Sequence, residues 1–97
     1  MVTWGHLIVG GGSVVRLVGD GNTGIRECVA SELLAYRKEC GLSQERFARM
    51  LRISVRSYID LEHGVSLPSA VTLLRWLLLM DEQEMLCFLA TIEECLP

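Results

Sequence analysis

The sequence predicts an all-α domain of five short helices over residues 28–97, preceded by a glycine-rich arm or β-hairpin over residues 1–27. Apolar residues in the longer part recur at three- and four-residue spacing, which is the period of an amphipathic helix. Serines precede several of these segments and glycines follow two of them, as is usual at helix termini. A chain of 97 residues, 51% of them hydrophobic, can form one domain with a small core.

The stretch from residue 42 to residue 64 predicts two short helices joined by a tight turn. Ser43 is placed to cap the first helix and Ser54 to cap the second. The turn falls at Arg52-Ile53, and Gly64 supplies the left-handed conformation that ends the second helix. One apolar stripe with a small residue beside it joins the two helices: Phe47, Met50, Leu51, Tyr58 and Leu61, with Ala48 alongside.

A longer helix is expected before this stretch, from about Glu27 or Cys28 to Cys40, ending at Gly41. Its candidate core residues are Val29, Leu33, Leu34 and Tyr36.

Two more helices are expected after it. Ser69 caps a helix over residues 70–79 that is apolar almost all round, so most of its sides should be covered. The last helix runs from about Glu82 to Cys95. Its apolar stripe comprises Met85, Phe88, Leu89, Ile92 and Leu96. Either the last helix covers the apolar one within a single chain, or both contribute to a dimer interface.

The arm, residues 1–27, holds seven of the nine glycines and predicts a β-hairpin, with apolar runs 4–9 and 13–18 on either side of three consecutive glycines. A lone hairpin is marginally stable in water. It therefore pairs with a copy of itself, folds onto its own domain, or remains a mobile or non-native extension. The string Gly19 to Gly24 matches the G-x-G-x-x-G pattern of dinucleotide sites. Because the residues after it are helical, we expect a flexible turn there and no cofactor.

Other chemistry finds little support in the sequence. His6 and His63 have no nucleophile or metal ligand at motif spacing, so we expect neither an enzyme nor a metal site. The four cysteines include no C-x-x-C pair, which favours reduced, partly buried thiols in a cytoplasmic protein over disulfide or metal roles. The most apolar run, residues 73–80, is too short to cross a bilayer, and we expect neither a signal peptide nor a membrane partner.

The charge is distributed unevenly along the chain, although the net charge is only -3. Residues 28–80 carry seven Lys or Arg and five acids, whereas residues 81–97 carry five acids and no base. Positive charge therefore gathers in the two-helix stretch, where it favours a nucleic-acid partner, and negative charge gathers in the last helix.

The chain from about residue 29 to residue 80 resembles the helix-turn-helix domain of the phage repressor and Cro (XRE-like) transcriptional regulators. The matching residues are Arg37, Gly41-Leu42-Ser43-Gln44, Phe47-Ala48, Leu51, Ile53-Ser54, Tyr58, Leu61-Glu62, Gly64 and Pro68. The resemblance implies a lambda-repressor-like five-helix bundle in which residues 54–62 enter the major groove of DNA. It also implies an ion pair between Arg37 and Glu62, and positions facing the DNA at Gln44, Val55, Arg56 and Asp60.

Arg56 is the best candidate for direct reading, because its planar guanidinium can bond guanine O6 and N7 together. Val55 can touch a thymine methyl group. The amide of Gln44, with free backbone N–H groups at the start of its helix, can hold a phosphate. Ser54 caps its helix and can contact a phosphate as well. The candidates for neutralising backbone charge are Arg46, Arg49 and Arg52, and the alternative for each is an ordinary solvated position.

Three residues depart from the family pattern. Asp60 puts a negative charge toward the groove, where it can accept from cytosine N4 or repel phosphate. Ile59 is apolar where a polar residue is usual, and His63 stands near the place of a Lys or Arg that grips phosphate.

Two functions follow. The first is a sequence-specific DNA-binding transcription regulator, a homodimer on a two-fold operator of double-stranded DNA. The second is the same fold used for protein contact, as an antitoxin-like or regulatory partner, through Ile59 or the acidic C-terminal helix.

Overall fold

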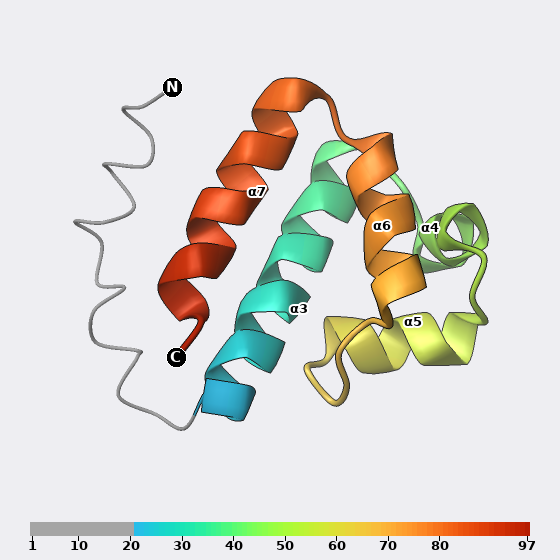
Figure 1. Ribbon diagram of the computed structural model, residues 1–97. Helices are drawn as coiled ribbons and strands as arrows, with labels where there is room; N and C mark the ends of the chain where they lie inside the picture. The colour runs from blue at the N-terminus through green and yellow to red at the C-terminus, as the bar shows by residue number, and fades with distance from the viewer. Residues whose placement is uncertain (1–20) are drawn as a thin grey trace.

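The computed structural model describes residues 21–97, which fold as five α-helices (Figure 1). They are α3 (Gly21–Glu39), α4 (Gln44–Leu51), α5 (Val55–Glu62), α6 (Ala70–Leu79) and α7 (Glu82–Cys95). The structure therefore confirms the all-helical prediction for this part of the chain. The hairpin predicted within residues 4–18 lies outside the described residues.

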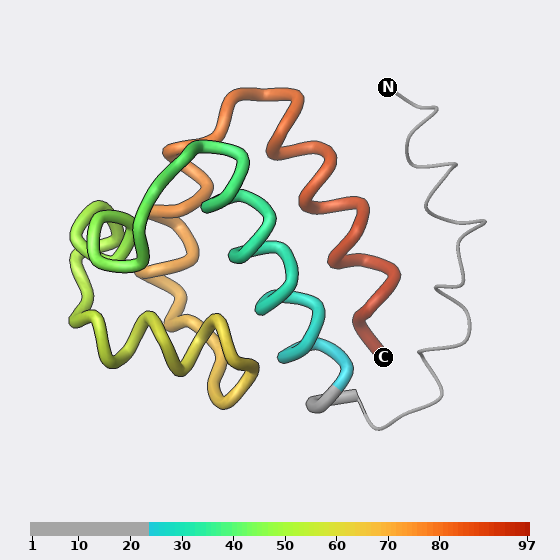
Figure 2. Tube along the Cα trace, turned by 180° about the vertical axis from the view of Figure 1, so that it is seen from behind, coloured from blue at the N-terminus to red at the C-terminus, as the bar shows by residue number. Residues whose placement is uncertain are grey.

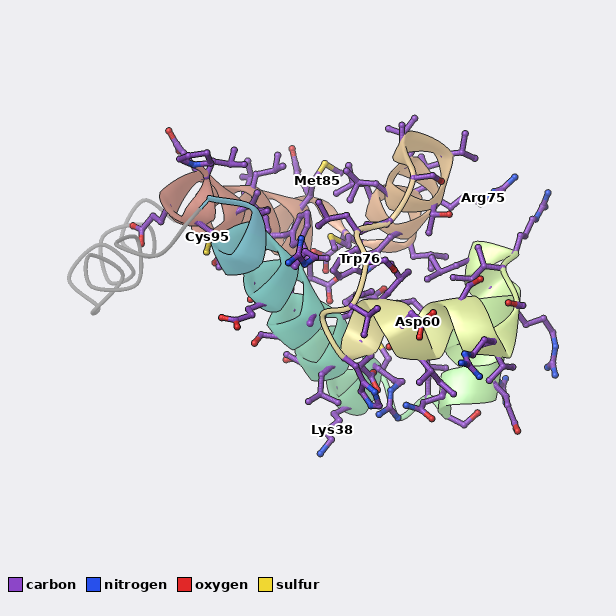
Figure 3. The ribbon with its side chains drawn as sticks, turned by 90° about the horizontal axis from the view of Figure 1, so that it is seen from below. Lys38, Asp60, Arg75, Trp76, Met85 and Cys95 are labelled. Atoms are coloured by element: carbon purple, nitrogen blue, oxygen red, sulfur yellow. The ribbon has the colours of Figure 1, made fainter. Side chains whose placement is uncertain are left out.

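The helices surround α3, which packs against both α5 and α7, while α4 packs against α5 and α6. The helices α3 and α7 lie side by side and run in opposite directions, as seen from the front and from behind (Figures 1 and 2). α5 lies across one end of the domain and faces the viewer in Figure 3. No helix within residues 21–97 is long and apolar enough to span a membrane.

The first helix begins at Gly21, about two turns before the predicted start near Glu27. Ile25 lies one turn before Val29 and packs against the core, so the apolar face of α3 continues toward its N-terminus. The last residues of the glycine string, 21–24, are consequently helical rather than a flexible turn.

The turns after α3, α4 and α5 share one backbone geometry. After α3, the N–H of Gly41 donates to the Lys38 carbonyl and the N–H of Leu42 to the Arg37 carbonyl, which is the Schellman arrangement. Equivalent bonds follow α4 and α5. The left-handed residues are Gly41, Arg52 and Gly64, with φ of 67°, 61° and 75°. Both predicted glycine stops are confirmed, and at the middle one an arginine takes the place of glycine.

Side-chain caps start the other four helices. Ser43, Ser54 and Ser69 each accept a hydrogen bond from the backbone N–H three residues later, as predicted. Asp81 does the same for Glu84, whose carboxylate accepts from the Asp81 N–H in return, forming a capping box that the sequence analysis did not anticipate.

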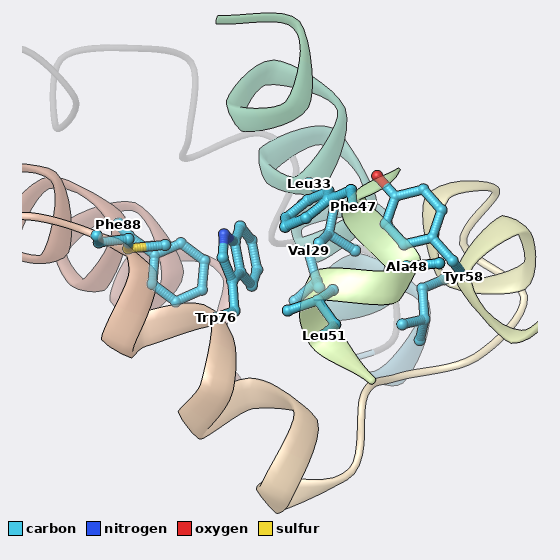
Figure 4. Packing of buried hydrophobic residues seen from close by; sticks show 10 residues of the cluster. Val29, Leu33, Phe47, Ala48, Leu51, Tyr58, Trp76 and Phe88 are labelled. Carbon is cyan, nitrogen blue, oxygen red and sulfur yellow. The ribbon is translucent and has the colours of Figure 1, made fainter. Parts of the chain in front are cut away.

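An aromatic cluster occupies the centre of the domain (Figure 4). The Phe47 ring lies 5.3 Å from that of Tyr58 and 6.4 Å from that of Trp76, measured between centroids. Trp76 also contacts the rings of Phe88 at 4.6 Å and Tyr36 at 6.1 Å. These separations are in the range of favourable aromatic pairs. The predicted core residues that are buried are Val29, Leu33, Phe47, Ala48, Leu51, Tyr58 and Leu61.

Two predicted core residues are exposed. Leu34 and Met50 lie on the outer faces of their helices. The inner face of α3 continues instead through Tyr36, which packs against the core and donates a hydrogen bond from its hydroxyl to the Leu79 carbonyl. On α4 the small Ala48 takes the inner place beside Phe47.

Within one chain the apolar helix α6 is covered on one side only, so the predicted arrangement in which the last helix covers it is wrong, while the alternative of a dimer interface stays a prediction. Trp76 faces the core, but Val71, Leu74 and Leu78 are exposed, with Leu78 retaining 83% of its accessible surface. The reason is that α7 packs along α3 and meets α6 through the ring contact of Trp76 with Phe88. On α7, the predicted stripe divides: Met85, Phe88 and Ile92 pack on the core, whereas Leu89 and Leu96 face outward.

Candidate nucleic-acid interface

The carboxylate of Glu62, at the end of α5, is the junction that fixes α5 to the rest of the domain. Its Oε2 lies 2.8 Å from Arg37 Nε, and its Oε1 lies 3.2 Å from Arg37 Nη2, so the guanidinium binds it in a bidentate manner. Gln44 Nε2 donates to Oε1 at 2.7 Å, and the hydroxyl of Tyr58 donates to Oε2. The predicted pair of Arg37 and Glu62 is therefore confirmed.

This junction is sheltered from solvent. The side chain of Glu62 retains 5% of its accessible surface and that of Arg37 retains 17%. Burial by itself raises the pKa of Glu62, but hydrogen bonds from Arg37, Tyr58 and Gln44, together with the Arg37 charge, outweigh burial and lower it below 4.5. Burial and the neighbouring Glu62 carboxylate raise the pKa of Tyr58, so its hydroxyl stays a donor. Charged and neutral partners thus hold helices α3, α4 and α5 together at one point.

The turn between α4 and α5 is held from the other side by α6. Arg75 Nη1 donates to the carbonyl of Leu51, the last residue of α4, at 3.5 Å. A cation at this end of a helix also complements its dipole. The neighbouring Ile53 packs partly against the core, which fixes the direction in which α5 leaves the turn.

The outer face of α5 carries Arg56, Asp60 and His63. These positions lie one turn apart, opposite the buried Tyr58 and Leu61, because a helix repeats every 3.6 residues. The side chain of Arg56 is 85% exposed, and its Nε lies 3.8 Å from Oδ1 of Asp60, whose side chain is 40% exposed. Figure 3 shows Asp60 on the side of α5 that is turned away from the domain.

The remaining predicted positions lie on α4, in the turn and at the start of α5. Arg46 and Arg49 on α4, Arg52 in the turn, and Ser54 and Val55 at the start of α5 are all exposed. The Ser54 Oγ accepts a hydrogen bond from the backbone N–H of Ser57, and the Ser54 hydroxyl donates to the Ser57 hydroxyl at 3.0 Å. The structure thus brings four exposed arginines, Arg46, Arg49, Arg52 and Arg56, to the two helices of the motif and the turn between them.

Gln44 and Ile59 differ from the expectation of freely exposed side chains. Gln44 is half-buried, and one amide hydrogen is engaged by Glu62, so only the rest of its amide and its backbone N–H remain for another partner. Ile59 is also half-buried, so only part of its side chain is available to a protein partner.

Four contacts at this site were not predicted. The Tyr58 bond to Glu62 could have been found, since the two residues lie four apart on one helix. The Gln44 bond to Glu62 gives no signal in the sequence, because a spacing of eighteen residues becomes meaningful only once the fold is known. Arg75 likewise acts across 24 residues of chain. The pair of Arg56 and Asp60 could have been found, since oppositely charged residues four apart on a helix face one another.

Elsewhere in the described residues, 21–97, no group of three or more His, Cys, Asp or Glu side chains is placed to hold a metal ion. Two cavities flank the α3–α7 packing, with volumes of about 390 Å³ and 230 Å³. Both are lined by glutamates and cysteines, and the first lies beside Cys28 and Cys95.

Two short helices joined by a tight turn, with one face of the second helix packed on the domain and the other exposed, define a helix-turn-helix domain. A family model described as Helix-turn-helix matches residues 33–82, just over half of the chain. The chain therefore belongs to the Cro/C1-type, XRE-like helix-turn-helix family, whose members are DNA-binding transcription regulators. No curated protein and no solved structure matches the chain.

Proposed function

We propose that this protein is a sequence-specific transcription regulator that inserts α5 into the major groove of DNA as a homodimer. The observation that carries the proposal is the outer face of α5, where the guanidinium of Arg56 stands 85% exposed, opposite the residues that anchor the helix. A helix of this kind fits the major groove, where each base pair presents a distinct set of donors and acceptors.

Base reading rests on Arg56 and Val55. The Arg56 guanidinium is long enough and free enough to donate two parallel hydrogen bonds to O6 and N7 of a guanine. Val55, exposed at the start of the same helix, offers methyl groups to a thymine methyl. These two contacts would give sequence preference, because contacts to the phosphate backbone carry no sequence information directly.

Backbone contacts rest on the residues around α5. The exposed arginines Arg46, Arg49 and Arg52 supply positive charge, and Ser54 and His63 supply polar groups at the two ends of the helix. At the start of α4, the backbone N–H of Gln44 and its remaining amide hydrogen would donate to a phosphate, because the N-terminus of a helix favours an anion. Binding of this kind weakens steeply as salt rises, because counterions are released from the DNA.

The dimer contact is proposed at the exposed face of α6, formed by Val71, Leu74 and Leu78. Apolar surface gathered on one helix face is typical of an interaction site. Five acids and no base lie in residues 81–97, so two copies of α7 would repel each other and the contact should centre on α6. A second copy placed there would present a second α5 to the next half-site of the operator.

The test is a selection of operators from random double-stranded DNA at low salt, followed by binding measurements on the enriched site. Arg56→Ala should lose about 1–3 kcal/mol of specific binding and relax the preference at one base pair. Lys38→Ala is the matched control, because it removes one exposed positive charge from α3 and should leave the base preference unchanged. A wild-type selection without any enriched sequence would refute the proposal.

The second candidate function is protein contact through α7. The observation in its favour is the outward set of Leu86, Leu89 and Leu96 on a helix that is otherwise acidic, which fits a partner with apolar and basic groups. It becomes the better account if the operator selection returns nothing while the protein is folded.

A further inference from the structure

The outer face of α5 places a carboxylate directly beside the proposed base-reading arginine. Nε of Arg56 lies 3.8 Å from Oδ1 of Asp60, one helical turn further along. This distance is too long for a hydrogen bond and short enough for an ion pair. Both side chains extend into solvent, so the pair adds little to the stability of the free protein. The ion pair instead affects which edge of the Arg56 guanidinium is directed toward the DNA.

A guanidinium has two edges that can donate two parallel hydrogen bonds, one formed by Nη1 and Nη2 and one that contains Nε. Asp60 approaches the edge that contains Nε. With the carboxylate drawn toward that edge by charge, the end formed by Nη1 and Nη2 is the one that faces away from Asp60 and can meet a guanine. The carboxylate also makes it less favourable for Arg56 to turn aside and bind a phosphate, since the arginine would leave a negative charge behind beside the DNA backbone.

We propose that Asp60 is a positioning residue that holds Arg56 end-on for guanine and disfavours its use as a general phosphate contact. This inference rests on the proposed function of α5 as a reader of the major groove. The role would strengthen on docking, because displaced water lowers the local screening between the two charges. Asp60 would therefore weaken binding to unrelated DNA while sharpening the preference for the correct site.

Two other roles for Asp60 give different outcomes. If its carboxylate accepted a hydrogen bond from cytosine N4, its removal would change the preference at a base pair next to the one read by Arg56. If it were an ordinary solvated residue, its removal would change neither preference. Only the positioning role makes the loss of Asp60 appear as a loss of the guanine preference of Arg56.

The experiment is a double-mutant cycle on the selected operator, using Asp60→Asn, Arg56→Ala and the combination, each with specific and unrelated DNA. Asp60→Asn should bind unrelated DNA more tightly than wild type. Its ratio of specific to non-specific affinity should fall at least about five-fold, the lower end of what one bidentate base contact supplies. In the Arg56→Ala background the same change should alter that ratio by less than about two-fold.

Asp60→Glu, which keeps the charge on a longer side chain, should recover part of the guanine preference. Glu39→Gln, which removes an exposed acid from α3, is the control for net charge and should leave the preference unchanged. Full guanine preference in Asp60→Asn, or equal effects of that change with and without Arg56, would overturn the inference alone. A wild-type protein that selects no sequence would overturn it together with the proposed function.

Discussion

Replacing Glu62 by alanine should destabilise the domain more than any other single change at the interface. The Glu62 carboxylate accepts four hydrogen bonds, two from Arg37 and one each from Gln44 and Tyr58. Its removal leaves the largely buried guanidinium of Arg37 with only its hydrogen bond to the Leu42 carbonyl and no counter-charge, and it leaves the buried phenol of Tyr58 without its acceptor. Breaking a buried pair by deleting one member typically costs about 3–5 kcal/mol. A domain of this size has a total stability on the order of 5–10 kcal/mol, so the loss is a large fraction of it.

The measurement is urea unfolding followed by circular dichroism, at a fixed protein concentration because a dimer is proposed. Glu93→Ala is the matched control, since Glu93 is an exposed acid on α7 and its loss should change the unfolding free energy by less than about 0.5 kcal/mol. Changing Arg37 to methionine together with Glu62 to leucine should cost clearly less than the two single changes added together. A Glu62→Ala protein within about 0.5 kcal/mol of wild type would refute the reasoning.

Three further predictions follow from the turn, the junction and the exposed helix face. Arg52→Gly should raise the unfolding free energy by about 0.5–1 kcal/mol, because glycine adopts a positive φ without strain; urea unfolding curves would check this. If Arg52 contacts a phosphate, the same change should also reduce the salt dependence of DNA binding, measured by anisotropy titrations at several salt concentrations. The pKa of Glu62 is lower in the folded protein than its ordinary value of 4.5. The stabilisation of the fold by the Glu62 carboxylate is therefore complete above pH 4.5 and disappears as the pH falls through the folded pKa. Between pH 7 and pH 3, the urea midpoint should accordingly fall less for Glu62→Gln than for wild type. Leu78→Glu should weaken self-association at least about ten-fold in sedimentation experiments while leaving the fold unchanged, and Leu86→Glu on α7 should weaken it less.

The helical architecture could be predicted from the sequence because its signals are local. Serine caps, left-handed glycines and apolar spacing located α4, α5, α6 and α7 within a residue or two of their observed bounds. The predicted start of α3 was wrong, because the glycines near Gly21 favour a turn over a helix. The helix extends to Gly21 because Ile25 packs on the core, which the local sequence does not indicate. Local propensity is a weak guide where tertiary contacts provide most of the helix stability.

Solvent exposure was harder to predict than helix position. The sequence of α6 is apolar almost all round, and nothing in it indicates that α7 would pack along α3 instead. Where α7 packs depends on which helices Phe88 and Ile92 can contact after the short connection at Met80 and Asp81. Similarly, Met50 and Ala48 are both compatible with the inner face of α4, and the close approach of α5 selects the smaller one.

The anchoring of α5 connects the stability of the fold to the proposed recognition of DNA. A helix of eight residues is not stable by itself in water, so its position depends on contacts with its neighbours. Tyr58 and Leu61 supply the apolar contacts, and Glu62 supplies the charged ones at the end of the helix. Any change that weakens the contacts of Glu62 should therefore move Arg56 as well, although the two side chains lie on different sides of α5. Weaker DNA binding in a Glu62 variant would then reflect a displaced helix, whereas the same loss in an Arg56 variant, with the unfolding free energy unchanged, would reflect the missing base contact.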